Sequence, residues 1–318
     1  MPRASSRRTA TALLSLAGLI ALSACGGEGE SSDGGTSAAD GTTIAGVRIE
    51  QDDALHAALP TSIREAGEVR VATDVPYPPF EMFVQEGDSQ LTGLDYDLGQ
   101  ALAAKLGVDF TFTPQKFDGI VPAIQAGKFD VAMSAITDTE ERQEVVDFVD
   151  YSVSGSGILV AEGNPEKIRS LDDLCGKKVG VQAATNQLDL LEGHQSACEE
   201  AGRPEIDIRG YPKDSDAQLA LRSGQVVADV LTKPAAGWTA KTADDGKAFD
   251  LVEDPAATGG YNATPNGIAV TKDLPELTEA IRLALQQLMD EGTAEKIFAE
   301  YGVASIALDE ATVNAGKE

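Results

Sequence analysis

Short runs of β-branched residues alternate with helical patterns along most of this 318-residue chain. The expected strands cover residues 69–72, 129–136, 158–161, 178–182 and 226–231. The expected helices cover about 96–106, 214–223 and a long stretch from Leu277 that Gly292 interrupts. Strands that alternate with helices predict an α/β fold with mostly parallel sheets.

Two small, polar and glycine-rich segments, residues 151–157 and 258–267, lie about a hundred residues apart. If both cross between the same two lobes, the residues between them form one domain and the residues outside them form a discontinuous one. We therefore expect two parallel-rich sheets flanked by helices and joined by a two-strand hinge. The expected divisions are lobe 1 at 47–154 plus 262–310, lobe 2 at 155–261 and a tail at 311–318.

The N-terminal residues predict export. Three arginines precede an apolar stretch, residues 10–24, which is shorter than the roughly 20 residues that a membrane span needs. Residues 1–24 are therefore expected to be a signal peptide. The sequence LSAC at 22–25 resembles the lipobox of bacterial lipoproteins, which implies a lipid on Cys25, and residues 25–46 would form a flexible tether. The alternative is an ordinary signal peptide with an incidental cysteine.

The composition excludes several classes of function. The chain has 25 basic and 52 acidic residues, a net charge of −27, so its surface repels phosphate backbones and anionic lipids. We expect no nucleic-acid partner and membrane attachment by the lipid alone. Two His and three Cys leave little from which to build a zinc site, and no P-loop is present, so we expect no metal and no cofactor.

Cys175 and Cys198 are the two cysteines of the expected folded part. In an exported protein an even pair predicts a disulfide, and closing a loop of this length stabilises by roughly 3 kcal/mol. Two buried free thiols are the alternative.

The first chemical motif is DVPYPPFE at 74–81, directly after an expected strand. Its prolines fix an extended loop that displays Asp74, Tyr77 and Phe80 at the carboxyl edge of the sheet, where open α/β sheets bind ligands. Aromatic rings beside an acid suit a cationic or amide-bearing small molecule. The alternative is that the rings of Tyr77 and Phe80 pack on the core.

The second motif, residues 135–142, runs from a strand into a helix that Asp138 is expected to cap, with Glu141 three residues later. The N-terminal end of a helix can hold an anion, and the Thr137 hydroxyl can donate a hydrogen bond to it. Arg142 can form a bidentate hydrogen bond with a carboxylate. Alternatively, Arg142 pairs with Asp138 on a solvated face. A third motif, residues 179–187, places polar side chains at another helix start in the expected lobe 2.

In this order the motifs resemble the polar amino-acid-binding family of extracellular solute-binding proteins of bacterial ABC importers. The matching segments are 74–81, 93–107 (GLDYDLGQALAAKLG), 117–148, 175–187 and 266–302, within a match that covers about residues 60–305. The resemblance implies a two-lobed periplasmic-binding-protein fold with a ligand held between the lobes.

The resemblance also implies a ligand site. In the family's ligand site, the acidic and the aromatic residue of the first loop correspond to Asp74 and Tyr77 of this chain. The aromatic residue of the facing loop corresponds to Phe117. The positions that bind a ligand carboxylate fall on Ala135, Thr137 and Arg142, and the lobe 2 contacts fall near Gln182, Thr185 and Asn186.

The chain departs from the family pattern at one position. Where the family has an Asp that holds the ligand's α-ammonium, Thr232 stands here, followed by Lys233. A hydroxyl cannot pair a desolvated ammonium as a carboxylate can. Either Asp74 takes that role, or the register differs by a residue, or the ligand lacks a free α-amine.

We therefore expect a monomeric lipoprotein on the extracellular face of the bacterial cell membrane. It would capture a small carboxylate-bearing solute, an amino acid or a derivative, and deliver it to the permease of an ABC importer. One alternative is an enzyme on the same scaffold, similar to cyclohexadienyl dehydratase, but the expected cleft loops hold no nucleophile with a base. The other is a component that presents a ligand to a sensor; residues 303–318 contain no apolar segment of the kind expected after a receptor domain.

Overall fold

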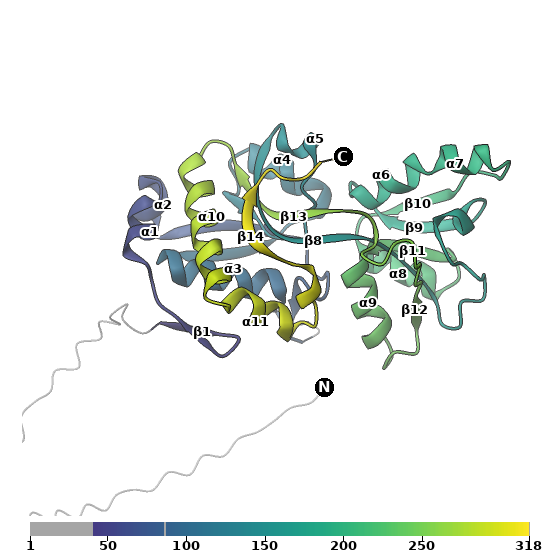
Figure 1. Ribbon diagram of the computed structural model, residues 1–318, viewed down its shortest axis with the longest axis horizontal. Helices are drawn as coiled ribbons and strands as arrows, with labels where there is room; N and C mark the ends of the chain where they lie inside the picture. Colours follow the sequence, from purple (N-terminus) through teal and green to yellow (C-terminus); the bar gives the residue numbers. More distant parts are fainter. Residues whose placement is uncertain (1–40, 86, 318) are drawn as a thin grey trace, which may run out of the picture. The chain divides into compact units, whose positions relative to one another are not determined.

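The computed structural model describes residues 41–85 and 87–317 (Figure 1). The expected signal peptide, the lipidated Cys25 and most of the tether lie outside the described residues. The described residues form one compact unit. Among the described residues, no helix combines the length and the apolar character that a membrane crossing requires.

The described chain contains both strands and helices in alternation. The strands are β1 (Thr42–Ile44), β2 (Val47–Ile49), β3 (Glu68–Thr73), β4 (Met82–Phe83), β5 (Leu91–Thr92), β6 (Asp109–Pro114), β7 (Val131–Ala132), β8 (Val146–Ala161), β9 (Lys178–Gln182), β10 (Asp207–Tyr211), β11 (Ala228–Thr232), β12 (Phe249–Leu251), β13 (Tyr261–Thr271) and β14 (Ala307–Val313). The α-helices are α1 (Asp53–Ala58), α2 (Thr61–Ala66), α3 (Leu94–Leu106), α4 (Ile120–Gln125), α5 (Glu140–Gln143), α6 (Asn186–Gly193), α7 (Gln195–Glu200), α8 (Asp214–Arg222), α9 (Lys233–Thr242), α10 (Pro275–Asp290) and α11 (Thr293–Glu300). Three short 3₁₀ helices cover Phe117–Gly119, Leu171–Leu174 and Ala304–Ile306.

One ten-stranded sheet runs through the fold, in the order β10-β9-β11-β8-β13-β7-β3-β6, with β12 and β14 also paired to β8. The strands β9, β10 and β11 pair in parallel at one end, and β3, β6 and β7 pair in parallel at the other. The expected α/β class with parallel strands and flanking helices is thus confirmed. The sheet is continuous where two were expected, because β8 and β13 are long enough to pair with strands at both ends (Figure 1).

The two glycine-rich segments lie on β8 and β13 or directly before them, where the strands run side by side. A side chain on Gly260, whose φ is 94°, would overlap the backbone of Gly155. The small residues are therefore required by the close approach of the two strands. The division into lobe 1 and lobe 2, named here by the residue ranges expected above, stays a prediction.

The leucine pattern of residues 94–106 forms α3, and the leucines at 94, 98, 102 and 106 are fully buried. Gly107 ends the helix in the left-handed conformation, as expected. The strand expected at 129–136 is wrong in its length, because only Val131–Ala132 pair with neighbouring strands. The chain turns away after that, and Ala135 adopts a φ of 46°.

The expected cap of α5 is also wrong. Thr139 caps this helix, with its hydroxyl accepting from the Arg142 amide at 3.3 Å. Asp138 is fully buried and accepts from the Gly316 amide at 2.7 Å. The reason is that residues after 310, expected as a tail, extend β14 along β8 and then cover Asp138.

The same C-terminal segment covers Asp150 on β8. One oxygen of Asp150 accepts from the Thr312 hydroxyl at 3.0 Å and from the Ala315 amide at 3.2 Å. Burial first, and then the nearby charge of Asp138, raise the pKa of Asp150 to about 7. Burial likewise raises the pKa values of Asp95 and Asp214 to about 7.

Because of these three carboxyl groups, we expect the free energy of unfolding to be larger in mild acid than at neutral pH. Because each pKa is higher in the folded than in the unfolded state, their contribution to stability is complete below about pH 4 and is lost as the pH rises through about 7. The free energy of unfolding, measured with denaturant, should therefore fall between about pH 5 and about pH 8. Asp150→Asn should flatten this slope, whereas the exposed Asp245→Asn should not; equal slopes in both variants would contradict the assignment.

Candidate functional site

A pocket lies where loops from both ends of the sheet meet. It is lined by Asp74, Tyr77, Glu81, Phe117, Ser134, Ala135, Thr137, Gln182, Thr185, Asn186, Gln187 and Thr232. These residues follow or end β3, β6, β7, β9 and β11, so they gather at carboxyl ends of strands, as expected for an open α/β sheet. The space inside is about 20 Å³, enough for about one water molecule.

The pocket brings together nine of the eleven ligand-binding residues that the sequence predicts. The two others lie beside it. Phe80 is fully buried behind Tyr77, with ring centroids 6.1 Å apart, so it supports the wall in the way that the core-packing alternative describes. Arg142 lines a neighbouring cavity of about 290 Å³.

Hydrogen bonds cross the pocket from lobe 1 to lobe 2. The Tyr77 hydroxyl lies 3.0 Å from the Thr232 hydroxyl and accepts from the Thr232 amide at the same distance. Gln182 Nε2 donates to Asp74 Oδ2 at 2.6 Å. The Thr137 hydroxyl donates to Asn186 Oδ1 at 3.0 Å. Side chains from opposite walls therefore satisfy one another in this conformation.

Arg142 also bridges the two lobes. One terminal nitrogen donates to the Thr137 carbonyl at 2.8 Å and the other to the Ala184 carbonyl at 3.0 Å. Its guanidinium carbon lies 5.7 Å from the centroid of the Phe117 ring, a cation–π distance. The guanidinium thus lies beside two residues of the pocket wall, whereas Asp138, its partner in the alternative, is fully buried and accepts from the Gly316 amide.

Two acidic side chains line the pocket and are buried in it. Asp74 is 7% and Glu81 is 1% exposed, and burial raises the pKa of both carboxyl groups, that of Glu81 well above its usual range. Glu81 Oε1 accepts from the Ser134 hydroxyl at 2.7 Å, whereas its buried Oε2 has no hydrogen bond within the described chain. No Lys, Arg or His is among the described residues that line the pocket.

Buried Asp95 fixes the turn that carries Ala135. Its carboxylate accepts from the Ala135 amide and from the Tyr151 hydroxyl, both at 2.7 Å. In this structure the Ala135 amide, which the resemblance assigns to the ligand carboxylate, is therefore used inside lobe 1. The Asp95 contact holds Ala135 in its left-handed conformation and so orients Ser134 and Thr137.

Thr232, which stands where the family has an Asp, contacts Tyr77 across the pocket. Thr232 ends β11, and its hydroxyl and amide both contact Tyr77. Lys233 turns away to the Glu253 carboxylate at 3.1 Å and the Thr258 carbonyl at 3.0 Å. Asp229, three residues earlier, is fully buried and does not line the pocket, so among the lining residues only Asp74 and Glu81 are acids.

Sequence reasoning missed three lining residues, Glu81, Ser134 and Gln187. Glu81 closes the DVPYPPFE motif, and its position seven residues after Asp74 gave no sign that the loop folds back to face Ser134. A tight turn accounts for this, in which the Tyr77 amide donates to the Glu81 carbonyl at 2.8 Å. The helix start at Thr185, in contrast, is confirmed: its hydroxyl caps α6.

Comparisons with known proteins identify the family of this chain. The family of bacterial extracellular solute-binding proteins, family 3, matches residues 69–304. The arginine-binding protein ArgT of Corynebacterium glutamicum is 31% identical, over 82% of this chain and 82% of its own length. The L-cystine-binding protein TcyJ of Escherichia coli K12 is 30% identical, over 75% of this chain and 84% of its own length.

Solved structures show the same fold. An ancestral arginine-binding protein bound to arginine has a TM-score of 0.64 and 36% identity, and the match covers 74% of this chain and 98% of that one. The ancestral amino acid-binding protein AncCDT-1, described as a precursor of cyclohexadienyl dehydratase, has a TM-score of 0.62 and 35% identity, with 76% of this chain and 97% of that one covered. On this match and this geometry, the chain belongs to the bacterial extracellular solute-binding proteins, family 3.

Proposed function

We propose that this protein captures an amino acid with a cationic side chain in the pocket between lobes 1 and 2, and delivers it to the permease of an ABC importer. One observation carries the choice of ligand. The pocket contains two buried acids, one of them with an unpaired oxygen, and no basic side chain among its described lining residues. A buried acid is stabilised most by a cation.

The relatives support this ligand class. ArgT binds arginine, and two relatives from Escherichia coli bind lysine, arginine and ornithine, or histidine. TcyJ, which binds L-cystine, and an ancestral arginine-binding protein bound to glutamine show that neutral side chains also fit this fold. The aromatic rings of Tyr77 and Phe117 offer faces for a guanidinium or an ammonium group. Asp74 and Glu81 would then pair the ligand's positive groups in place of the Asp that the family has near Thr232.

Binding requires the lobes to separate and close again. The space of about 20 Å³ is far too small for an amino acid, and hydrogen bonds join the two walls. A ligand would replace these contacts with its own, since Tyr77, Thr137 and Gln182 can each turn a polar group toward it. We propose β8 and β13 as the hinge because they connect the two lobes.

Arg142 is the proposed partner of the ligand carboxylate. Its guanidinium contacts the carbonyls of Thr137 and Ala184, which belong to opposite lobes, so lobe separation breaks at least one of the two hydrogen bonds. A carboxylate is a stronger acceptor for a guanidinium than a peptide carbonyl is.

The protein would work as a monomer outside the cell, tethered by a lipid on Cys25. The exporting N-terminal pattern and the extracellular family support this placement. An enzyme on this scaffold is the alternative, because the amino acid-binding protein AncCDT-1 is described as a precursor of cyclohexadienyl dehydratase. The described residues that line the pocket of this chain include Ser134 and Thr137 but no His or Cys, so we propose binding without turnover.

Replacing Glu81 tests the ligand class. Glu81→Gln keeps the size of the side chain and removes its negative charge, so arginine affinity measured by calorimetry should fall about tenfold, the cost of a charge-assisted hydrogen bond. Glutamine, which is neutral, should lose much less affinity. The exposed Glu295→Gln on α11 serves as the control, and equal losses for arginine and glutamine would contradict a cationic ligand.

Arginine binding should strengthen with rising pH. Burial raises the pKa values of Asp74 and Glu81 in the pocket, whereas a bound cation favours their charged forms, so binding below those raised pKa values releases protons. Calorimetry in buffers of different protonation enthalpy measures this release directly. The release should shrink in Glu81→Gln; arginine binding that releases no protons between about pH 5 and about pH 8 would argue against pairing with these acids.

Replacing Arg142 tests the carboxylate partner. Arg142→Ala should weaken binding of every amino acid about 30-fold or more, because truncating one partner of a buried charge pair costs about 2 kcal/mol or more. The matched control is Arg209→Ala, which removes a surface guanidinium that pairs with Asp207. Undiminished binding in Arg142→Ala would remove Arg142 from the site while leaving the proposed pocket in place.

A further inference from the structure

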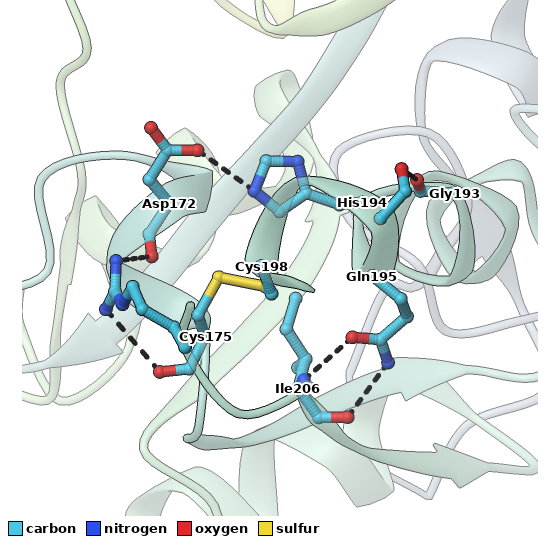
Figure 2. Close-up of a disulfide and its surroundings, with 9 residues drawn as sticks. Asp172, Cys175, Gly193, His194, Gln195, Cys198 and Ile206 are labelled. Atoms are coloured by element: carbon cyan, nitrogen blue, oxygen red, sulfur yellow. Dashed lines mark hydrogen bonds and ion pairs between the residues drawn. A yellow bond between two sulfur atoms is a disulfide. The ribbon is translucent and has the colours of Figure 1, made fainter. Parts of the chain in front are cut away.

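The disulfide of lobe 2 lies beside two further side chains with metal-binding atoms, and none of these four residues lines the ligand pocket. The structure joins Cys175 and Cys198 in the predicted disulfide, with Cα atoms 5.6 Å apart. The ligand atoms of Cys175, Cys198 and His194 all lie within 4.8 Å of one another. Asp172 Oδ1 lies 3.1 Å from His194 Nε2, and Figure 2 shows the imidazole beside both the disulfide and this carboxylate.

His194 Nε2 is a buried nitrogen without a hydrogen bond among the described residues. The Asp172 carboxylate lies 3.1 Å from this nitrogen, at ion-pair distance, but is not aligned as a hydrogen-bond acceptor. Buried polar atoms in native proteins normally have such a partner. The imidazole therefore offers an unpaired nitrogen within a cluster that also holds two sulfurs and a carboxylate oxygen.

The four residues form two closely spaced pairs along the chain, as the ligands of many zinc sites do. Asp172 and Cys175 form an Asp-x2-Cys pair at a 3₁₀ turn, and His194 and Cys198 form a His-x3-Cys pair at the start of α7. Zinc sites draw ligands in such pairs, from a turn and a helix, because residues three or four apart share one face. Tetrahedral zinc bonds of about 2.0 to 2.3 Å place ligand atoms about 3.3 to 3.8 Å apart. His194 Nε2 and Asp172 Oδ1 already lie 3.1 Å apart, whereas the two bonded sulfurs have to separate before they can bind a metal.

We propose that this cluster is a redox-gated zinc site. In the oxidised state the two sulfurs bind each other, and in the reduced state Cys175, Cys198 and His194 bind a zinc ion, with Asp172 as the fourth ligand. The Asp172 side chain is 75% exposed, so it can rotate onto the metal and also offers an entry path. Because the sulfurs cannot bond to each other and to zinc at once, the two states exclude one another.

The reduction balances with a dithiol as reductant. A thiolate of the dithiol attacks one sulfur of the pair, the S–S bond breaks and the other cysteine leaves as a thiolate. The second thiol of the reductant then displaces the first cysteine, so the dithiol leaves as a disulfide, and its two electrons and two protons remain on Cys175 and Cys198. Zinc then replaces the two thiol protons, which pass to solvent.

The surroundings fit both states. The Arg203 guanidinium donates to the Asp172 and Cys175 carbonyls and so holds the turn through the backbone, without using the sulfurs. Its positive charge beside Cys175 also favours the thiolate that zinc requires. In either state residues 175 and 198 remain cross-linked, so the loop between them stays closed.

The test is metal binding by the purified protein before and after reduction. A phosphine is the reductant because it leaves no thiol to compete for metal; it takes up one oxygen from water as the disulfide gains two electrons and two protons. The reduced protein should bind one equivalent of Co²⁺ with the visible bands of tetrahedral cobalt and a thiolate-to-cobalt charge-transfer band, and Zn²⁺ should displace it. The oxidised protein should show neither band.

Variants identify the ligands. His194→Ala should weaken Zn²⁺ binding by the reduced protein at least about tenfold, and Asp172→Ala by less, as measured against a chromophoric chelator. The paired Cys175→Ser, Cys198→Ser variant should abolish the charge-transfer band. His56→Ala and Asp207→Ala, which remove an imidazole and a carboxylate elsewhere, should bind as the native protein does.

Two results would overturn the proposal. One is cobalt binding without a thiolate band, or with the same affinity in His194→Ala, which would indicate adventitious binding by surface acids. The other concerns folding: the melting temperature of the reduced protein should rise with Zn²⁺, and a reduced chain that is unfolded and gains no structure with Zn²⁺ has no zinc site. Neither result would affect the amino-acid pocket, which the oxidised protein already contains.

Discussion

A single buried carboxylate, that of Asp95, connects the parts of the structure on which the pocket depends. It lies at the start of α3, accepts from the amide that precedes the Thr137 loop, and accepts from Tyr151 on the hinge strand β8. A carboxyl group buried among apolar side chains is costly unless donors surround it, so these contacts must form together. Helix, binding loop and hinge therefore acquire fixed relative positions before any ligand is considered.

The contacts between the lobes are of a different kind. They are hydrogen bonds between side chains of the pocket walls, each with a net contribution of roughly 1 kcal/mol, because water competes for the same groups. A set of this size can hold the lobes together and can still be exchanged for a ligand's contacts. Tyr77, Asp74 and Thr137 thus serve as closing contacts and as candidate ligand contacts in the same place.

Most of the fold could be predicted from the sequence, because it rests on patterns that are local. The leucine repeat of α3, the strand KVGVQ and the cap at Thr185 each follow from a few adjacent residues. The errors arise where distant residues decide the conformation. Asp138 has the sequence context of a helix cap, yet the C-terminal segment buries it, and Ala135 leaves the expected strand because Asp95, forty residues away, accepts its amide. Glu81 was missed for a related reason, since the pocket forms only when the 74–81 loop folds back on Ser134.

The cluster around the disulfide also depends on residues that are distant in sequence. Counting two His and three Cys argued against a metal site, but a count ignores which residues folding brings together. Asp172 and Cys175 meet His194 and Cys198 because α6 ends at Gly193, directly before His194, and α7 then begins. The N-terminal end of α6 carries Thr185 and Asn186 into the pocket, about 12 Å along the helix from the cluster. Because an eight-residue helix moves as a rigid element, holding its C-terminal end by a disulfide or by a metal keeps its N-terminal end, and so one wall of the pocket, in place.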